Sequence, residues 1–387
     1  MKSIELFTGA GGLALGSHLA GFEHVALVEW NKVACDTLRR NSQDGALPGI
    51  DRWNVLQTDI RTLVDFRQFG RVDLVAGGVP CQPFSLGGKH KGMNDERDMF
   101  PDFVRAVRDL QPKAFIIENV KGLLRSTFRN YFSYVYLQLN YPEVHRKKAE
   151  GWEEHLRRLE DVRTKGRYAG LQYNVIFRLL NAADYGVPQT RERVFIVGFR
   201  SDIEHPWHFP EPTHSYEALM REQWVTGKYW ERHGVRRPKV VPAHAKAFLK
   251  NNEELFDSSK PWRTIRDAIH DLPEPRTDAE PEDVFNHRLN PGARAYPGHT
   301  GSDYDLPSKT LKAGVHGVPG GENMISFADG TLRYLTAREA ARVQTFPDKW
   351  RFEGAWSEAM RQLGNAVPMD LAAVVAKSVA KKLKEKR

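Results

Sequence analysis

Short apolar runs alternate with amphipathic stretches of helical length through the first 120 residues, and no other feature limits the possible folds of the chain so strongly. Such alternation is typical of parallel strands whose connecting helices cover both faces of one sheet. We therefore expect an α/β fold built on a doubly wound sheet. The expected strands are 4–7, 25–29, 55–58, 72–76 and 114–118, followed by 174–177 and 194–198.

Two regions interrupt this pattern. Residues 143–167 are highly charged, and Leu156 and Leu159 could seat them on the domain as a solvated helical insertion. From about 200 to 325 the chain is rich in Pro, Gly, His and Trp and has few clear strands. The expected boundaries are 1–199 and 326–387 for a large domain and 200–325 for a second, irregular domain.

The chain carries an excess of positive charge, which favours polyanionic partners. Its 57 Lys and Arg against 49 Asp and Glu give a net charge of +8 and a pI near 9.3. In residues 221–250 eight basic residues outnumber two acidic ones, and Trp224, Tyr229 and Trp230 are interleaved with them. Many basic stretches are only solvated faces, but this one suits phosphate contacts with aromatic support, so we expect it to contact nucleic acid.

Two cysteines are too few for the disulfide framework of a secreted scaffold. The first residues lack the apolar stretch of a signal peptide, and no apolar run approaches the ~18 residues that span a bilayer. We expect a soluble protein of a reducing, intracellular compartment.

One of the two cysteines stands where an open α/β sheet binds its ligands. Cys81 follows the apolar run 72–79 in a Gly-Val-Pro-Cys turn, which would lift the thiol to the carboxyl edge of the sheet. Free cysteines are more often small buried hydrophobes, and that alternative stays open from the local sequence. The position favours a nucleophile, whereas Cys35 lies in an amphipathic helical stretch and is expected to be core packing.

A glycine-rich turn after the first expected strand points to a nucleoside cofactor. Phe7 begins the run Phe-Thr-Gly-Ala-Gly-Gly, and glycines there let the backbone approach a ligand closely. Glu29 stands 20 residues after Gly9, the spacing at which a carboxylate can receive ribose hydroxyls, and Trp30 follows it. The pattern fits a dinucleotide or S-adenosylmethionine, and Asp59 could bind an adenine amino group or simply form a turn.

Five blocks of sequence, taken in order, resemble the motifs of the cytosine-5 DNA methyltransferases. The blocks are Phe-Thr-Gly-Ala-Gly-Gly at 7–12, Gly-Val-Pro-Cys-Gln-Pro-Phe-Ser at 78–85, Glu-Asn-Val at 118–120, Gln-Thr-Arg-Glu-Arg at 189–193 and Gly-Asn-Ala-Val-Pro at 364–368. The resemblance implies a Rossmann-like methyltransferase domain, S-adenosylmethionine as methyl donor, and a cytosine flipped out of a specific short sequence of duplex DNA. It also implies that residues 200–325 form a target-recognition domain.

The resemblance assigns roles to particular residues. It implies that the Cys81 thiolate attacks carbon 6 of cytosine and that Glu118, with a pKa raised by burial, relieves charge at ring nitrogen 3. Arg193 and Arg191 match the charged pair of the motif, one orienting the base and Glu118 and the other bracing the loop by ion pairs, although Arg191 could be purely structural. The implied cofactor-binding residues are Phe7, Gly9, Gly11, Gly12, Glu29, Trp30, Asp59, Pro80 and Asn365. The implied DNA-binding residues are Gln82, Ser85, Lys89 and Lys91, in a glycine- and lysine-rich lid, and no metal is expected.

Three other functions fit parts of this sequence. A methyltransferase acting on RNA would share the catalytic blocks, a silent DNA-binding scaffold would share the fold, and the glycine turn alone would suit a nicotinamide-dependent dehydrogenase. The preferred interpretation is a bacterial restriction-modification or defence enzyme, cytoplasmic and associated with the nucleoid. It would be a monomer on DNA, and any cognate endonuclease would be a separate protein.

Overall fold

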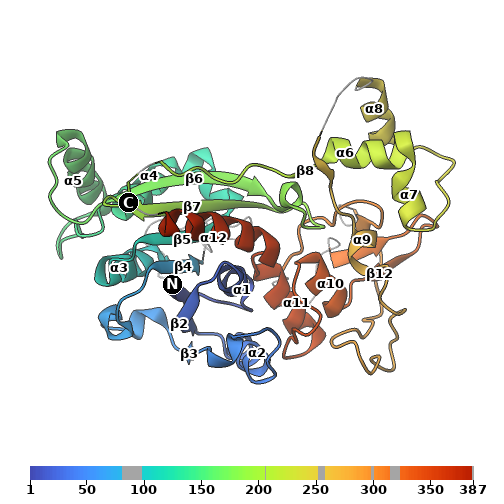
Figure 1. Cartoon of the computed structure of the whole chain (residues 1–387), viewed down its shortest axis with the longest axis horizontal. Coiled ribbons are helices and arrows are strands. Elements are labelled where there is room, and N and C mark those ends of the chain that lie inside the picture. Colours follow the sequence, from blue (N-terminus) through green and yellow to red (C-terminus); the bar gives the residue numbers. More distant parts are fainter. Residues whose placement is uncertain (81–97, 205, 252–257, 298–299, 314–322, 386–387) are drawn as a thin grey trace.

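A twisted seven-stranded sheet forms the centre of the large domain (Figure 1). The computed structural model describes residues 1–80, 98–204, 206–251, 258–297, 300–313 and 323–385. The sheet has the strand order β3-β2-β1-β4-β5-β7-β6. Its strands are β1 (Lys2–Leu6), β2 (Glu23–Glu29), β3 (Val55–Gln57), β4 (Leu74–Gly78), β5 (Ala114–Val120), β6 (Tyr173–Asn181) and β7 (Glu192–Arg200).

Strands β1 to β5 run parallel, as the alternating pattern predicts, and β6 has the same direction, whereas β7 runs opposite to them. β7 pairs antiparallel with both β5 and β6 and lies between them. The carboxyl ends of β1 and β4 therefore lie at one edge of the sheet, and β7 begins at that edge. Residues from distant parts of the chain meet there, where open α/β sheets bind ligands.

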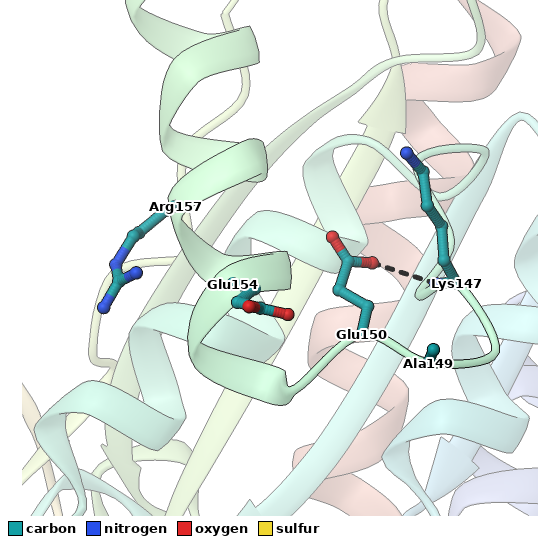
Figure 2. Close-up of a pocket in the computed structure, with 5 residues that line it drawn as sticks. All are labelled: Lys147, Ala149, Glu150, Glu154 and Arg157. Atoms are coloured by element: carbon teal, nitrogen blue, oxygen red, sulfur yellow. Dashed lines mark hydrogen bonds between the residues drawn. The ribbon is translucent and has the colours of Figure 1, made fainter.

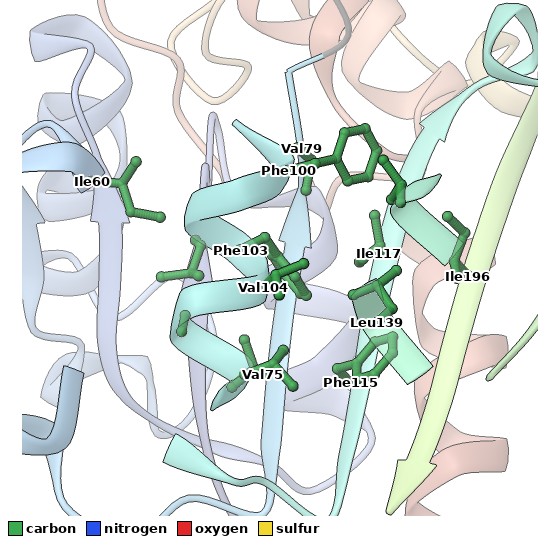
Figure 3. Close-up of a cluster of buried hydrophobic side chains, with 14 of the residues drawn as sticks. Ile60, Val75, Val79, Phe100, Phe103, Val104, Phe115, Ile117, Leu139 and Ile196 are labelled. Atoms are coloured by element: carbon green, nitrogen blue, oxygen red, sulfur yellow. The ribbon is translucent and has the colours of Figure 1, made fainter. Parts of the chain in front are cut away.

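Helices cover both faces of the sheet and bury its apolar residues. On one face, α3 (Phe100–Leu110) and α4 (Arg129–Asn140) pack on β1, β4 and β5, and Figure 3 shows Phe103, Phe115 and Leu139 within this cluster. On the other face lie α1 (Gly12–Leu19) and α12 (Met369–Lys384). The remaining helices are α2 (Lys32–Gln43), α5 (Trp152–Lys165), α6 (Tyr216–Arg221), α7 (Lys228–Arg232), α8 (Ala243–Asn251), α9 (Ile265–Ile269), α10 (Ala337–Val343) and α11 (Trp356–Asn365).

The end of the chain packs directly on its beginning. A Cβ atom placed on Gly12 would lie 2.0 Å from the Val367 carbonyl oxygen, and one on Gly16 would lie 2.6 Å from the Ala373 nitrogen. Only glycine at these two positions allows α1 to approach α12 and the segment before it so closely. The glycine-rich stretch therefore forms a turn and also allows close packing of α1 on the last segment of the chain.

The stretch Trp356–Lys384, which contains α11 and α12, is long and apolar enough to cross a membrane by length and composition. This corrects the expectation that no segment approaches that length. However, 67% of its most apolar window is buried inside the protein, and Leu371, Val375 and Val379 lie in the core with β4 and β5. We interpret it as core packing.

The charged excursion forms α5, which extends from one end of the molecule (Figure 1). Leu159 is fully buried and Leu156 partly buried against α4. His155 is also buried, which the charged pattern of this segment did not predict. Its ring contacts the Tyr134 hydroxyl at 2.9 Å and the Val144 carbonyl at 2.5 Å. The insertion is therefore bound to the domain by a polar contact as well as by leucines.

An open hollow of about 490 Å³ lies beside α5, between Lys147, Glu150, Glu154 and Arg157 (Figure 2). The Glu150 carboxylate accepts hydrogen bonds from the Lys147 backbone N–H and from the guanidinium of Arg158, which lowers the pKa of Glu150 to about 2. The hollow mixes both signs of charge, and this carboxylate is already engaged. We interpret it as a structural feature of the insertion.

The second domain contains short elements around a small aromatic core. A π-helix, Glu222–Thr226, joins α6 to α7, and the short strands are β8 (His214–Ser215), β9 (Lys260–Pro261), β10 (Ser302–Asp303) and β11 (Met324–Ser326), which ends at the expected boundary. β12 (Leu332–Tyr334) lies beyond that boundary and pairs with β11. Trp224, Tyr229 and Trp230 are buried in that core. The expectation that these rings support phosphate contacts is therefore wrong: a domain with so few apolar residues needs them inside. Arg232 is likewise paired with Glu222 and Asp267.

Candidate active site

The glycine-rich turn leaves β1 in a conformation that favours glycine and opens space for a ligand. Phe7, Gly9 and Gly11 have positive φ angles of 57°, 56° and 93°. A Cβ atom on Gly9 would meet nothing within 4 Å, so the surface there is open. The turn therefore exposes backbone at Gly9 and packs against the protein at Gly11 and Gly12.

Glu29 is buried at the end of β2, and its carboxylate fixes the turn. One oxygen accepts from the Gly9 N–H at 2.8 Å, and the other accepts from the Trp30 and Asn31 N–H groups at 2.9 and 2.8 Å. A carboxylate has about four acceptor positions, so one position remains after these three bonds. The bonds hold Glu29 beside Gly9, where a ribose hydroxyl could reach it.

Two neighbouring residues flank this point differently. Trp30 is 72% exposed, so the face of its indole ring is accessible to a planar group. Asp59 caps a short helix instead: its carboxylate accepts from the Arg61 backbone N–H and pairs with the Arg61 guanidinium, which lowers the pKa of Asp59. Of the two roles that the sequence left open for Asp59, its carboxylate performs the turn-forming one in this structure.

The cofactor candidates Pro80 and Asn365 lie close to the same region. Pro80 is half-buried two residues beyond β4, and Asn365 is exposed at the end of α11. Asn365 is two residues before Val367, whose carbonyl packs on Gly12. An open glycine backbone, a carboxylate with one free acceptor position and an exposed indole together fit a nucleoside cofactor.

Glu118 and Arg193 form a buried ion pair at the carboxyl edge of the sheet. The Arg193 Nε lies 2.9 Å from the Glu118 Oε1. Strand register creates this pair, because Glu118 on β5 sits opposite Gly78 of β4, and Val120 sits opposite Arg193 of β7. The acid therefore stands beside the strand that leads into the Pro-Cys turn.

The charge state of Glu118 results from two opposing effects. Burial raises the pKa of Glu118 above its ordinary value, and the positive charges of Arg193 and Arg191 oppose this rise. The contact between the Arg193 Nε and the Glu118 Oε1 therefore favours the charged carboxylate, while burial favours the protonated acid. A buried carboxyl with a raised pKa at the edge of the sheet is suited to exchanging a proton with a ligand.

Asn119 is a site residue that the sequence did not single out. Its side-chain amide donates to the Val79 carbonyl at 3.2 Å, and its own oxygen accepts from the Val120 N–H at 2.8 Å. It thereby holds the backbone just before Pro80 against β5. Cys81, Gln82, Ser85, Lys89 and Lys91 lie outside the described residues.

Arg191 is fully buried and binds three carbonyl groups. Its guanidinium donates to Leu311 at 3.1 Å, to Gly364 at 2.7 Å and to Ala366 at 2.9 Å. Burial lowers the pKa of Arg191, and the nearby Arg193 adds to the effect. The sequence predicted a brace made of ion pairs, whereas in the described part of the chain this guanidinium braces through carbonyls of two distant segments.

Replacing Arg191 with methionine is expected to lower the free energy of unfolding by at least about 2 kcal/mol, because three buried carbonyls lose their donor. Urea denaturation would measure this loss. Arg67→Met is the control: the Arg67 side chain is 76% exposed and pairs with the exposed Asp65, so its loss should cost less than about 0.5 kcal/mol. Equal midpoints for the two variants would contradict the bracing role.

A family model described as C-5 cytosine-specific DNA methylase matches residues 1–141 and 154–381 of this chain. The type II methyltransferase M.NgoMIV of Neisseria gonorrhoeae is 31% identical over 392 residues, covering 99% of this chain and 98% of the relative. M.Eco47II of Escherichia coli is 33% identical over 385 residues, covering 97% and 78%.

Solved structures agree on the fold. A putative DNA modification methyltransferase from an E. coli prophage aligns with a TM-score of 0.54 at 23% identity over the whole of both chains. The Dnmt2 methyltransferase of Schizosaccharomyces pombe ("S. pombe") aligns with a TM-score of 0.55 at 20% identity, covering 99% and 98%. The fold is thus the Rossmann-like methyltransferase fold with a smaller domain, and the chain belongs to the C-5 cytosine-specific DNA methylase family.

Proposed function

We propose that this protein is the modification enzyme of a bacterial type II system, with the Glu118–Arg193 pair and Cys81 at its catalytic centre. As a family member it is a DNA (cytosine-5-)-methyltransferase that takes its methyl group from S-adenosylmethionine. The observation that carries the residue assignment is the buried ion pair placed beside Gly78, at the end of the strand that leads to Cys81.

Cys81 is the proposed nucleophile. Its thiolate attacks carbon 6 of a flipped cytosine and forms a carbon–sulfur bond, while the ring electrons shift toward carbon 5 and nitrogen 3. Glu118 gives a proton to nitrogen 3, and Arg193 holds both the carboxyl and the base in place. After carbon 5 has gained the methyl group, a base removes its hydrogen, the carbon–sulfur bond breaks to release the Cys81 thiolate, and nitrogen 3 returns its proton to Glu118.

The cofactor site is proposed at the glycine-rich turn. The sulfonium of bound S-adenosylmethionine supplies the electrophilic methyl group. Glu29 would receive a ribose hydroxyl, Trp30 would cover the adenine ring, and the open backbone at Gly9 would admit the ligand. Phe7, Pro80 and Asn365 would line the same site. Asp59 would have to bind the adenine amino group while its carboxylate stays paired with Arg61.

We propose that residues 200–325 read the DNA target. The exposed basic residues of segment 221–250 would contact the DNA phosphates. We further propose that Gln82, Ser85, Lys89 and Lys91 contact DNA. The enzyme would work as a monomer in the bacterial cytoplasm, and a separate endonuclease would cut the same sequence. One flipped base and one target-reading domain need no second copy of the chain.

The proposed function is tested by mapping 5-methylcytosine in a host that lacks cytosine methylation. Cells that express the protein should carry the mark at one short motif, and cells with an empty vector should carry none; bisulfite sequencing measures both. RNA from the same cells should show no new mark. Methylation of RNA alone, or of neither nucleic acid, would contradict the proposal.

A further inference from the structure

A seam of hydrogen bonds joins the second domain to the strand that carries Arg193. The Ser308 N–H donates to the Pro188 carbonyl at 2.9 Å, and the Thr190 N–H donates to the Ser308 carbonyl at 2.8 Å. The Thr310 hydroxyl donates to the Thr190 carbonyl at 2.8 Å. Segment 308–312 is therefore held, bond by bond, against residues 188–191, directly before β7 begins.

The seam ends at Leu311, whose two backbone groups are both bound by side chains of the large domain. Its N–H donates to the Gln189 Oε1 at 3.0 Å, and its carbonyl accepts from Arg191 at 3.1 Å. Gln189 also donates to Gln344, which donates in turn to the Leu363 carbonyl. All of these amide and guanidinium groups are buried, so their bonds are not weakened by water.

Both backbone groups of the next residue, Lys312, are bound by the side chain of Asn323, further along the chain. Its N–H donates to the Asn323 Oδ1 at 3.0 Å, and its carbonyl accepts from the Asn323 Nδ2 at 2.9 Å. Asn323 is fully buried, and its own carbonyl accepts from the Leu335 N–H at 3.0 Å. The Asn323 amide thus satisfies both backbone groups of Lys312, as a neighbouring strand would. Through the bond from Leu335 it also joins the seam to the end of β12.

Close packing against Gly364 of α11 also holds the end of the seam in place. A Cβ atom on Gly364 would lie 2.4 Å from the Lys312 carbonyl carbon and 2.3 Å from the Ala313 nitrogen. Residues 312 and 313 are therefore pressed onto the end of α11, next to Asn365. Small displacements at this point cannot be absorbed without moving one domain relative to the other.

We propose that Asn323 is a positioning residue for target discrimination: its amide fixes segment 308–312, and through it the second domain, at a set distance from Glu118 and Arg193. The inference rests on the proposed function, in which the second domain reads the base edges of duplex DNA. A second domain that is free to shift would bring related sequences into the site as well as the correct one, because discrimination depends on exact placement of donors and acceptors.

The test is Asn323→Asp, which replaces the Nδ2 donor with an acceptor facing the Lys312 carbonyl. Duplexes carry either the mapped target or the target with one base pair changed, and kcat/KM for methylation is measured on both. We expect the ratio of target to altered target to fall about tenfold, since one base pair is normally discriminated by this much or more. KM for S-adenosylmethionine should stay within twofold of the wild type.

Asn41→Asp is the matched control. Asn41 is also fully buried and binds both backbone groups of one distant residue, Arg351, at 2.7 Å each, but it has no contact with the seam. The two variants should lose similar thermal stability, and only Asn323→Asp should lose discrimination. An unchanged ratio in Asn323→Asp, or an equal fall in Asn41→Asp, would overturn the proposal.

A milder variant covers the case in which Asn323→Asp does not fold. Thr310→Val keeps the shape of the side chain and removes only the hydrogen bond to Thr190, so the ratio should fall a few-fold. If Thr310→Val folds like the wild type and keeps the wild-type ratio of kcat/KM on the two duplexes, the seam does not control discrimination. A wild-type protein that methylates no DNA would instead reject the proposed function, which separates the two failures.

Discussion

A Cys81→Ser variant is expected to lose methyl transfer to DNA by at least about 10⁴-fold, as enzymes do when a covalent nucleophile is removed. A serine hydroxyl is almost fully protonated at neutral pH, whereas a thiol placed near positive charge is partly ionised and attacks readily. Transfer of a labelled methyl group to a target duplex under single-turnover conditions measures the loss. Binding of S-adenosylmethionine and of DNA should persist, because the substitution removes neither site.

The second cysteine provides the control for this experiment. Cys35 lies in α2, its thiol donates to the Glu29 carbonyl at 3.4 Å, and burial raises its pKa to about 11. Such a thiol stays protonated and cannot act as a nucleophile, so Cys35→Ser should retain nearly full activity. Loss of activity in both variants, or in neither, would contradict the assignment of the nucleophile.

A duplex with 5-fluorocytosine at the target would separate chemistry from binding. Fluorine at carbon 5 cannot leave as a proton, so the carbon–sulfur bond to Cys81 cannot break after methyl transfer. The wild type and Cys35→Ser should form an adduct that survives denaturing electrophoresis, and Cys81→Ser should form none. An adduct with Cys81→Ser would show that another group attacks the base.

The sheet of the large domain could be predicted from the sequence, but the pairing of its last two strands could not. Apolar runs marked each of the seven strands, because the five inner strands are buried on both faces and the edge strands β3 and β6 are partly buried. The insertion of β7 between β5 and β6 depends on contacts between residues far apart in the chain, which local patterns do not record. The same is true of the register that sets Glu118 opposite Gly78.

The second domain was where local patterns misled most. Basic residues alternating with Trp224, Tyr229 and Trp230 looked like a binding surface, yet these rings form the core of the domain. A pattern of charge and aromatic residues cannot tell an inward ring from an outward one without a helical or strand period to orient it. In contrast, Glu29 could be predicted because its distance from Gly9 along the chain follows from one strand–helix–strand unit.

The contacts of the positioning residues could not be predicted from the sequence, even where a motif block contains the residue, as it does for Asn119 and Arg191. Asn119 binds the backbone of Val79, Arg191 binds carbonyls near residues 311 and 365, and Asn323 binds the backbone of Lys312. Each one contacts main-chain atoms, which every residue possesses, so nothing in the partner's identity reveals the contact. Motifs show which residues carry chemistry, and the fold shows which residues hold them in place.

A Glu118→Gln variant is expected to lower the single-turnover rate about 10²–10⁴-fold, the range typical of losing a general acid. Glutamine keeps the size of the side chain but has no proton to give to ring nitrogen 3. The pH dependence should also change. Burial raises the pKa of Glu118, so the acid keeps its proton to higher pH than a free glutamate and loses it as pH rises through that pKa. The wild-type rate should fall on this alkaline side, opposite to the effect of forming the Cys81 thiolate.

In Glu118→Gln the alkaline fall should disappear while the rise at lower pH remains, because only one of the two titrating groups has been removed. Glu339→Gln is the matched control: Glu339 is buried and pairs with Arg333 at 2.7 Å, far along the chain from the site. Both variants leave a partly buried arginine without its charge partner and should lose stability. Only the change at Glu118 should alter the rate and its pH profile, since a carboxyl that merely held Arg193 would lower the rate without removing a titration. A Glu118→Gln profile with the wild-type alkaline fall would therefore show that another group supplies the proton.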